Sequence, residues 1–404
     1  MRIINNGHLC YCTNIHLGES WPEVLESLEY ALRVKAKISP DAPFGIGLRL
    51  SAQAAEQLGE GGALRRFKEW LTSHDCYVFT MNGFPYGGFH GQVVKDQVHA
   101  PDWTTPERLD YTRQLFNQLA YLLPEGMDGG VSTSPISYRL WHKTPAELEA
   151  VLHTGARQMA KLVAHLAQLK KKTGKQLHLD VEPEPDGVLE NSREFLTFFD
   201  DYLLTTGVET LQDVLACDAA TAADALRQHL QLCYDVCHFA VAYEEHAEVL
   251  RSLTDRGIKV GKIQISAAVK TLLGNPAARG IIRERLQPYH ESTYLHQTAY
   301  RNRDGTVEQF PDLDVALGEL NNPSYEELRT HFHVPIFTEE YGALQSTRSD
   351  IETVLRLWQE QPFSPHLEVE TYTWDVLPDN NQLELTESIY RELIWVVETL
   401  HKTD

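Results

Sequence analysis

Short apolar runs alternate along the chain with longer stretches in which apolar residues recur every three or four positions. The short runs are typical of strands buried on both faces, and the longer stretches are typical of amphipathic helices. Their alternation predicts βαβ units and a parallel sheet. The expected strands span residues 8–16, 44–51, 76–81, 130–136, 176–182, 232–238 and 259–266. With an eighth strand, the pattern predicts α/β architecture in one domain over residues 1–404, a single (β/α)8 TIM barrel with C-terminal insertions.

Two of the predicted helices begin with strong N-terminal signals. Ser20 and Thr144 each precede a proline-led turn, and the third helical position in each turn is a glutamate, Glu23 or Glu147. A hydroxyl residue and a glutamate at this spacing form a capping box, and proline is favoured at the first helical turn. The expected helices span about 21–38, 53–73, 105–123, 144–172 and 386–400.

Three segments compete to be the strand that closes the barrel: 293–300, 331–337 and 366–374. The last is favoured, because the helix expected at 386–400 follows it and would complete the ring. The first is expected to form a hairpin with 307–310, outside the barrel. Segment 331–337 stays open between an extra strand and the true seventh or eighth strand.

Charge and composition exclude several classes of protein. The chain has 404 residues, 42% of them hydrophobic, which is ordinary for a globular protein, and its net charge is −21. A surface of this sign repels phosphate backbones and anionic lipids, so we expect neither nucleic-acid binding nor membrane insertion. No targeting signal and no run of 18 apolar residues is present. The six cysteines form no CxxC pair, so reduced thiols and a cytoplasmic location are expected.

Polar residues gather where the predicted strands end. In a parallel barrel these carboxyl ends form one mouth, where active sites lie. Buried carboxylates cost several kcal/mol unless a cation compensates them, so carboxylates with imidazoles indicate a divalent metal. The residues concerned are Asn14, His16, Arg49, Asn82, Ser132, Ser134, Asp180, Glu182, Asp235, His238, Gln264, His331, His333, Glu368 and Glu370.

Several of these stretches resemble a known family. An LDVEP strand, a YDVCH strand and a strand ending in IQIS are similar to the xylose-isomerase-like barrels, which include sugar isomerases, ketose 3-epimerases and endonuclease-IV-type enzymes. The stretches CTNIHLGESW, LDVEPEPDG, YLHQTAYR and HLEVETYTWDVLP resemble, more closely, the EboE family of bacterial ebo clusters. That resemblance implies a role in metabolite traffic or processing, and a functional link to a UbiA-like prenyltransferase encoded beside it.

The wider superfamily resemblance implies a ligand set. It matches metal-binding carboxylates to Glu182, Asp235 and Glu370, with Glu368 as a rival to the last, and a substrate-binding histidine to His238. Where the superfamily has a histidine ligand on the seventh strand, this chain has Gln264. Its amide carbonyl could ligate weakly, or His296 or His333 could reach in instead. The expected ion is Mg²⁺, Mn²⁺ or Zn²⁺.

This set of residues predicts a metal-dependent isomerase or epimerase that acts on a small hydroxylated metabolite. Glu182 and Glu370 are the expected acid–base pair, working through an enediolate. The expected metal ligands are Glu182, Asp235, Gln264, His333 and Glu370, and the expected substrate-binding residues are His238, His16, Asn14, Arg49 and Asn82. A metabolite-binding or traffic protein without turnover is the alternative. An endonuclease-IV-like nuclease is the weakest reading, because of the net charge of −21.

Many aromatic residues follow the third and fourth predicted strands. They predict a wide, ring-lined pocket for an aromatic or prenylated metabolite, since rings supply large apolar contact area. In the alternative reading they pack the loops against the barrel rim. The rings are Phe84, Tyr86, Phe89, Trp103, Tyr138, Trp141 and, beyond the last strand, Trp374.

Overall fold

Eight parallel strands close into a barrel in this computed structural model, which describes residues 1–91, 93–377 and 384–402. The strands follow the order β1-β14-β7-β6-β5-β4-β3-β2. A bridge between Cys12 and Gly47 joins β1 to β2 and closes the ring. The barrel strands are β1 (His8–Tyr11), β2 (Phe44–Arg49), β3 (Cys76–Asn82), β4 (Gly129–Thr133), β5 (Leu177–Val181), β6 (Leu230–Asp235), β7 (Val260–Ile265) and β14 (His366–Val369).

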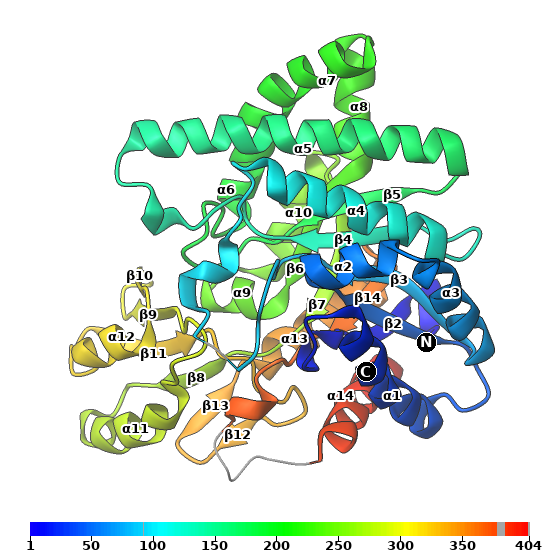
Figure 1. Cartoon of the computed structure of the whole chain (residues 1–404). Coiled ribbons are helices and arrows are strands. Elements are labelled where there is room, and N and C mark those ends of the chain that lie inside the picture. The colour runs from blue at the N-terminus through cyan, green and yellow to red at the C-terminus, as the bar shows by residue number, and fades with distance from the viewer. Residues whose placement is uncertain (92, 378–383, 403–404) are drawn as a thin grey trace.

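Helices surround the barrel, and the long helix α5 crosses one side of it (Figure 1). The capping boxes predicted at Ser20 and Thr144 start α1 and α5. No described helix has the length and apolar character needed to cross a bilayer. The surrounding helices are α1 (Trp21–Ile38), α2 (Ala52–Gly59), α3 (Ala63–Ser73), α4 (Pro106–Leu122), α5 (Pro145–Thr173), α6 (Ser192–Thr197), α7 (Val208–Leu215), α8 (Ala219–His229), α9 (Val236–Val241), α10 (His246–Asp255), α13 (Arg348–Glu360) and α14 (Leu385–His401).

A second sheet of six strands, order β10-β9-β11-β8-β13-β12, leaves the barrel after β7 and returns to it before α13. With α11 (Arg279–Leu286) and α12 (Leu313–Glu319) it forms a lobe beside the barrel (Figure 1). Because β8 starts just beyond the carboxyl end of β7, this lobe lies at the mouth end. Its strands are β8 (Val269–Leu272), β9 (Thr298–Asn302), β10 (Val307–Phe310), β11 (Tyr325–Thr330), β12 (Glu340–Tyr341) and β13 (Leu344–Ser346).

The structure settles the three rival closing segments. Residues 366–369 form the eighth barrel strand, as favoured, and β9 pairs with β10 as the predicted hairpin. The expectation of a strand at 331–337 is wrong: β11 ends at Thr330, and the chain then crosses the mouth without regular structure. Pro335 removes a backbone donor there, which disfavours a central strand. Pro378, the last residue of one resemblance motif, lies outside the described residues.

Three other predicted boundaries are corrected. The first strand ends at Tyr11 rather than residue 16 and is followed by a short 3-10 turn. The sixth ends at Asp235, whose carboxylate accepts the backbone N–H of His238 and so starts α9. The helix expected at 53–73 is two helices, because Gly61 and Gly62 adopt φ of +51° and +76° between them. Only glycine adopts such angles readily.

The interior of the barrel is charged. His178, Asp180 and Glu182 follow one another at alternate positions along β5 and the residue after it, and His366, Glu368 and Glu370 do so along β14 and the residue after it. At mid-height the fully buried Lys262 lies 2.6 Å from the fully buried Glu368 carboxylate and donates to Ser132 Oγ at 3.0 Å. A Cβ at Gly47 would overlap that carboxylate, so glycine is required where β1 meets β2.

Lys262→Met should destabilise the protein by about 3–5 kcal/mol, because it leaves the Glu368 charge buried without its partner. The double variant Lys262→Met/Glu368→Met, which removes both charges at similar volume, should recover most of that loss. Urea unfolding of the two variants beside the unaltered chain measures both effects. Equal destabilisation by the single and the double variant would show that the ion pair does not set the cost.

Candidate functional site

Three carboxylates meet at the mouth of the barrel. Asp235 ends β6, while Glu182 and Glu370 lie one residue beyond the ends of β5 and β14. All three are buried, and each offers an oxygen within 4.8 Å of those of the other two. These are the carboxylates that the resemblance predicted as metal ligands, so the structure brings that part of the predicted set together.

The three carboxylates differ in electrostatic state. Burial, and then the neighbouring acidic groups, raise the pKa of Glu182 and of Glu370 well above the usual range. Burial also works against the charge of Asp235, but His238, His333 and a hydrogen bond from Ser266 Oγ at 2.6 Å hold its pKa below the usual value. Burial and the neighbouring carboxylates therefore disfavour the charged forms of Glu182 and Glu370, whereas the surroundings of Asp235 favour its charge.

Glu370 is held by three side-chain amides. Asn14 and Asn82 donate to Glu370 Oε1 at 2.9 and 3.0 Å, and Gln264 donates to Oε2. The carbonyl of Gln264 accepts from the Cys233 thiol. Gln264 therefore lies among the predicted ligands, but its carbonyl oxygen is engaged by the thiol.

His333 supplies an imidazole beside the carboxylates. Its Nδ1 bonds the backbone carbonyl of Glu370 at 2.7 Å, and its Nε2 has no hydrogen-bond partner among the described residues. His333, Asp235 and His238 have ligand atoms within 4.8 Å of one another. Asp235 thus belongs both to this group and to the three-carboxylate group. His296, the other histidine considered for this role, uses both ring nitrogens, on Glu291 and on the His331 carbonyl.

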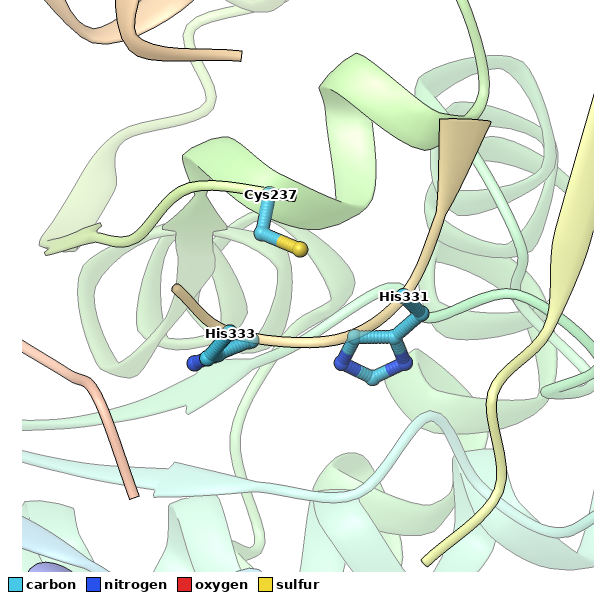
Figure 2. Close-up of side chains that lie close together, drawn as sticks. All are labelled: Cys237, His331 and His333. Atoms are coloured by element: carbon cyan, nitrogen blue, oxygen red, sulfur yellow. The ribbon is translucent and has the colours of Figure 1, made fainter. Parts of the chain in front are cut away.

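Further ligand-type side chains adjoin His333. Figure 2 shows Cys237, on the first turn of α9, close to His331 and His333 on the segment that crosses the mouth; the three offer ligand atoms within 4.8 Å. His331 Nε2 lies 3.2 Å from His238 Nε2, and His238 Nδ1 bonds the Pro183 carbonyl at 2.9 Å. The lobe therefore adds imidazoles to a site whose carboxylates come from the barrel.

Several buried ligand atoms have no hydrogen-bond partner among the described residues. They include Glu182 Oε2, Asp235 Oδ2, Glu184 Oε2 and His333 Nε2. Leaving such atoms unsatisfied costs about 1–3 kcal/mol each, and more for charged groups. Two or three carboxylates with one imidazole form a donor set that fits a divalent ion.

Two predicted substrate-binding residues lie elsewhere. His16 bonds the Tyr11 hydroxyl at 2.8 Å, stacks on Tyr30 and lines a separate hollow near the start of α1. Arg49 pairs with Glu19 at 2.9 Å and donates to the Gly87 carbonyl. Neither lines the cavity over the carboxylates, whereas Asn14, Asn82 and His238 do.

Glu184 was missed in the sequence. It lies two residues beyond Glu182, lines the cavity, and has a pKa that burial and the Asp235 charge raise to about 8. His331 and His238 are close enough to share a ligand position with it. The spacing Glu182-Pro183-Glu184 after an apolar strand was the available signal, because prolines hold the chain extended and alternate residues then share a face.

A hollow that opens to solvent lies over the carboxylates. Phe84 and Phe89 from the predicted ring set line it, together with Tyr294 and Tyr372. Phe89, Tyr294 and Tyr372 lie with ring centroids 5.1–5.2 Å apart. The other predicted rings pack the loops instead. Trp103 is fully buried and donates to Thr133 Oγ1, and Trp374 is buried too. Tyr138 and Trp141 pack against His99 and each other, and Tyr86 packs on Tyr111.

Comparison with known proteins identifies the fold. No family model matches the chain, and no curated protein matches it in sequence. A xylose isomerase-like TIM barrel protein from Mycobacterium smegmatis, solved in complex with magnesium, has a TM-score of 0.51 at 10% identity, over 99% of this chain and 98% of that one. The fold is that of a xylose-isomerase-like TIM barrel. The zinc-bound IOLI protein has a TM-score of 0.48 at 15% identity, over 97% of this chain and 98% of its own.

In this xylose-isomerase-like barrel, the raised pKa values of the mouth glutamates should make the stability of the folded state depend on pH. Glu184 keeps its proton up to about pH 8 when folded, against 4.5 for an ordinary glutamate, and Glu182 and Glu370 are shifted in the same direction. The folded state therefore binds more protons than the unfolded chain above pH 4.5. The stability from these groups is full below that pH and falls as pH rises toward 8, by at most about 1.4 kcal/mol per pH unit for each group.

Urea unfolding with a chelator present, from pH 5 to pH 8, measures this slope. Glu184→Gln should flatten it, since an amide does not titrate. A slope unchanged in Glu184→Gln would contradict the role given to Glu184.

Proposed function

We propose that this chain is a divalent-metal-dependent enzyme that moves a proton next to a carbonyl of a small hydroxylated metabolite, as an isomerase or epimerase does. The proposed ligands are Glu182, Asp235 and Glu370, with His333 completing the set. The fold alone does not fix a reaction, so the proposal rests on the site.

The observation that carries the proposal is the set of unpartnered ligand atoms around Asp235. Glu182 Oε2, Asp235 Oδ2 and His333 Nε2 are buried without hydrogen-bond partners among the described residues. Asp235 shares one group with Glu182 and Glu370 and another with His333. His333 Nδ1 bonds the Glu370 carbonyl, which orients the ring and leaves Nε2 available, as is usual for histidines that bind metals. His333 thus replaces the histidine that is absent at Gln264.

The donor set favours an oxygen-preferring ion that also accepts imidazole. Carboxylates suit Mg²⁺ and Mn²⁺, while imidazole adds affinity for Mn²⁺ and Zn²⁺. We therefore expect Mn²⁺ to be the ion that best supports activity. A bound divalent ion would polarise the substrate carbonyl and acidify the neighbouring C–H bond.

Glu182 and Glu370 are the proposed acid–base pair. Both carboxylates line the cavity in which a substrate would bind, so each could reach a hydrogen beside its carbonyl. One carboxylate would accept the proton from the carbon beside the carbonyl, and the other would return a proton to the opposite face or the adjacent carbon. His238, Asn14 and Asn82 line the cavity and would bind substrate hydroxyls.

The cavity also bears on the kind of substrate. Phe89, Tyr294 and Tyr372 form an apolar wall beside the carboxylates, and rings bind flat or apolar groups well. This wall supports a metabolite with a ring or an apolar group beside its hydroxyls. The EboE resemblance, with its implied link to a UbiA-like prenyltransferase, agrees with an aromatic or prenylated substrate.

A second function, binding a metabolite without turnover, is favoured by the three amides around Glu370. A carboxylate that accepts from Asn14, Asn82 and Gln264 has both oxygens occupied, which hinders its action as a base. A traffic protein of the EboE kind needs a selective pocket but no proton transfer. Turnover distinguishes the two functions.

Proton exchange tests the enzymatic proposal directly. The Mn²⁺-loaded protein should exchange the hydrogen beside the carbonyl of its substrate with D2O, followed by NMR over a panel of ketoses and of aromatic or prenylated hydroxyketones. Glu182→Gln should lower the exchange rate about 10²–10⁴-fold, the range that general acid–base groups contribute. Compounds that bind and raise the melting temperature without exchanging would favour the binding protein instead.

His333→Gln should weaken Mn²⁺ binding by at least about 10-fold, because the amide is a poorer ligand than imidazole. Calorimetric titration of the chelator-treated protein with Mn²⁺ measures this affinity. His165→Gln is the matched control, since His165 lies on α5 and bonds Asn117 far from the mouth. Unchanged Mn²⁺ affinity in His333→Gln would remove His333 from the ligand set.

A further inference from the structure

A second cluster of ligand-type residues lies at the opposite, amino end of the barrel. Asp128 directly precedes β4, His178 is the second residue of β5, and His366 is the first residue of β14. Each offers a ligand atom within 4.8 Å of the other two. The mouth chemistry uses none of these residues.

The spacing of these atoms suits a tetrahedral ion. Asp128 Oδ1 lies 3.3 Å from His366 Nε2, and Asp128 Oδ2 lies 3.8 Å from His178 Nε2. Ligands at about 2.0–2.1 Å from a tetrahedral zinc ion lie about 3.3–3.4 Å from one another. Small side-chain movements would therefore bring all three into one coordination shell.

The histidines are arranged as metal ligands usually are. His178 Nδ1 lies 2.6 Å from the buried Asp180 Oδ1, so its Nε2 is the nitrogen directed at Asp128. A carboxylate behind a histidine fixes the ring and strengthens it as a ligand. His366 is fully buried; its Nε2 faces Asp128 Oδ1 at 3.3 Å, and its Nδ1 has no hydrogen-bond partner among the described residues.

Flanking glycines provide the space for this arrangement. A Cβ at Gly130 on β4 or at Gly261 on β7 would overlap the Asp180 carboxylate and approach the His178 ring.

We propose that Asp128, His178 and His366 bind a zinc ion at the amino end of the barrel. Two imidazoles with one carboxylate favour zinc over Mg²⁺ or Ca²⁺. The Asp128 side chain is 38% exposed, so water reaches the site and supplies the fourth ligand. β14 and β5 are separated in the barrel by β7 and β6, so the ion links strands across the interior. Its role is structural, because the amino end of such barrels serves stability rather than catalysis.

The test first weakens the mouth site. In the double variant Asp235→Asn/Glu370→Gln, purified without chelator and equilibrated with Zn²⁺, we expect one zinc per chain that depends on His366, by elemental analysis, and a lower melting temperature after chelation. Co²⁺ in place of zinc should give the visible absorption of a four-coordinate site. His366→Gln in the same background should lower zinc affinity at least 10-fold and abolish the zinc-dependent melting shift.

His229→Gln is the matched control. His229 is a buried histidine near the same end, bonded to the Leu177 carbonyl, and its loss should leave the zinc content unchanged. If the double variant does not fold, Asp128→Asn in the otherwise unaltered chain should reduce zinc content by one per chain. Zinc content and melting temperature that do not depend on His366 or Asp128 would overturn the proposal and leave a histidine–aspartate ion-pair network.

The two proposals fail separately. Loss of proton exchange and of Mn²⁺ binding at the mouth, with His366-dependent zinc retained, would remove the proposed function only. The absence of zinc from the amino end, with exchange intact, would remove this inference only.

Discussion

Burial of charge inside a closed barrel is the constraint on which the rest of this structure depends. β5 and β14 each present ionisable side chains at three successive inward positions, and the interior must compensate all of them. Lys262 neutralises Glu368 at mid-height, and Asp180 pairs with His178 below. At the mouth, amides and histidines surround Glu370 and Asp235, and several oxygens keep no partner among the described residues. Buried carboxylate oxygens without a partner among the described residues therefore remain at the mouth, whereas Lys262 and Glu368 compensate each other at mid-height.

The lobe after β7 changes what the mouth can bind. The barrel strands supply carboxylates and amides, whereas His331 and His333 lie on the segment that leaves the second sheet and crosses the opening. Gln264 fills the strand position at which the superfamily resemblance implied a histidine. The His333 imidazole thus reaches the site from the segment that crosses the mouth rather than from a strand of the barrel.

Much of this architecture was predictable from the chain, because strand and helix periodicities are local. The alternation of patterns indicated the eight-stranded barrel and placed many polar residues at its strand ends, and the superfamily resemblance then selected Glu182, Asp235 and Glu370 among them. The six-stranded sheet was not predicted beyond its one hairpin, since its pairings join segments far apart in sequence. β8 at residue 269 pairs with β11 near residue 328, and no local pattern reports such pairing.

The difference between local patterns and contacts made by distant segments also explains which individual side chains were placed correctly. Asn14 and Asn82 are in the cavity and His16 is not, because the first strand ends at Tyr11 and the two-residue alternation stops there. Arg49 points inward by its strand position, yet its nearest carboxylate is Glu19 in the loop after β1. The cluster of Asp128, His178 and His366 could not be recognised, since its members meet only when β14 lies across from β5.

The position of β14 between β1 and β7 has a consequence for how the chain is made. Translation proceeds from the N-terminus, so residues 366–369 are made after all seven other strands of the barrel. Until then the first and seventh strands have no shared neighbour, and Lys262 has no counter-ion from β14. A nascent chain must hold these polar faces in water and leave two strand edges open to other molecules. The ring therefore cannot close before β14 has been made, and a ribosome-bound fragment ending before residue 366 lacks a closed ring.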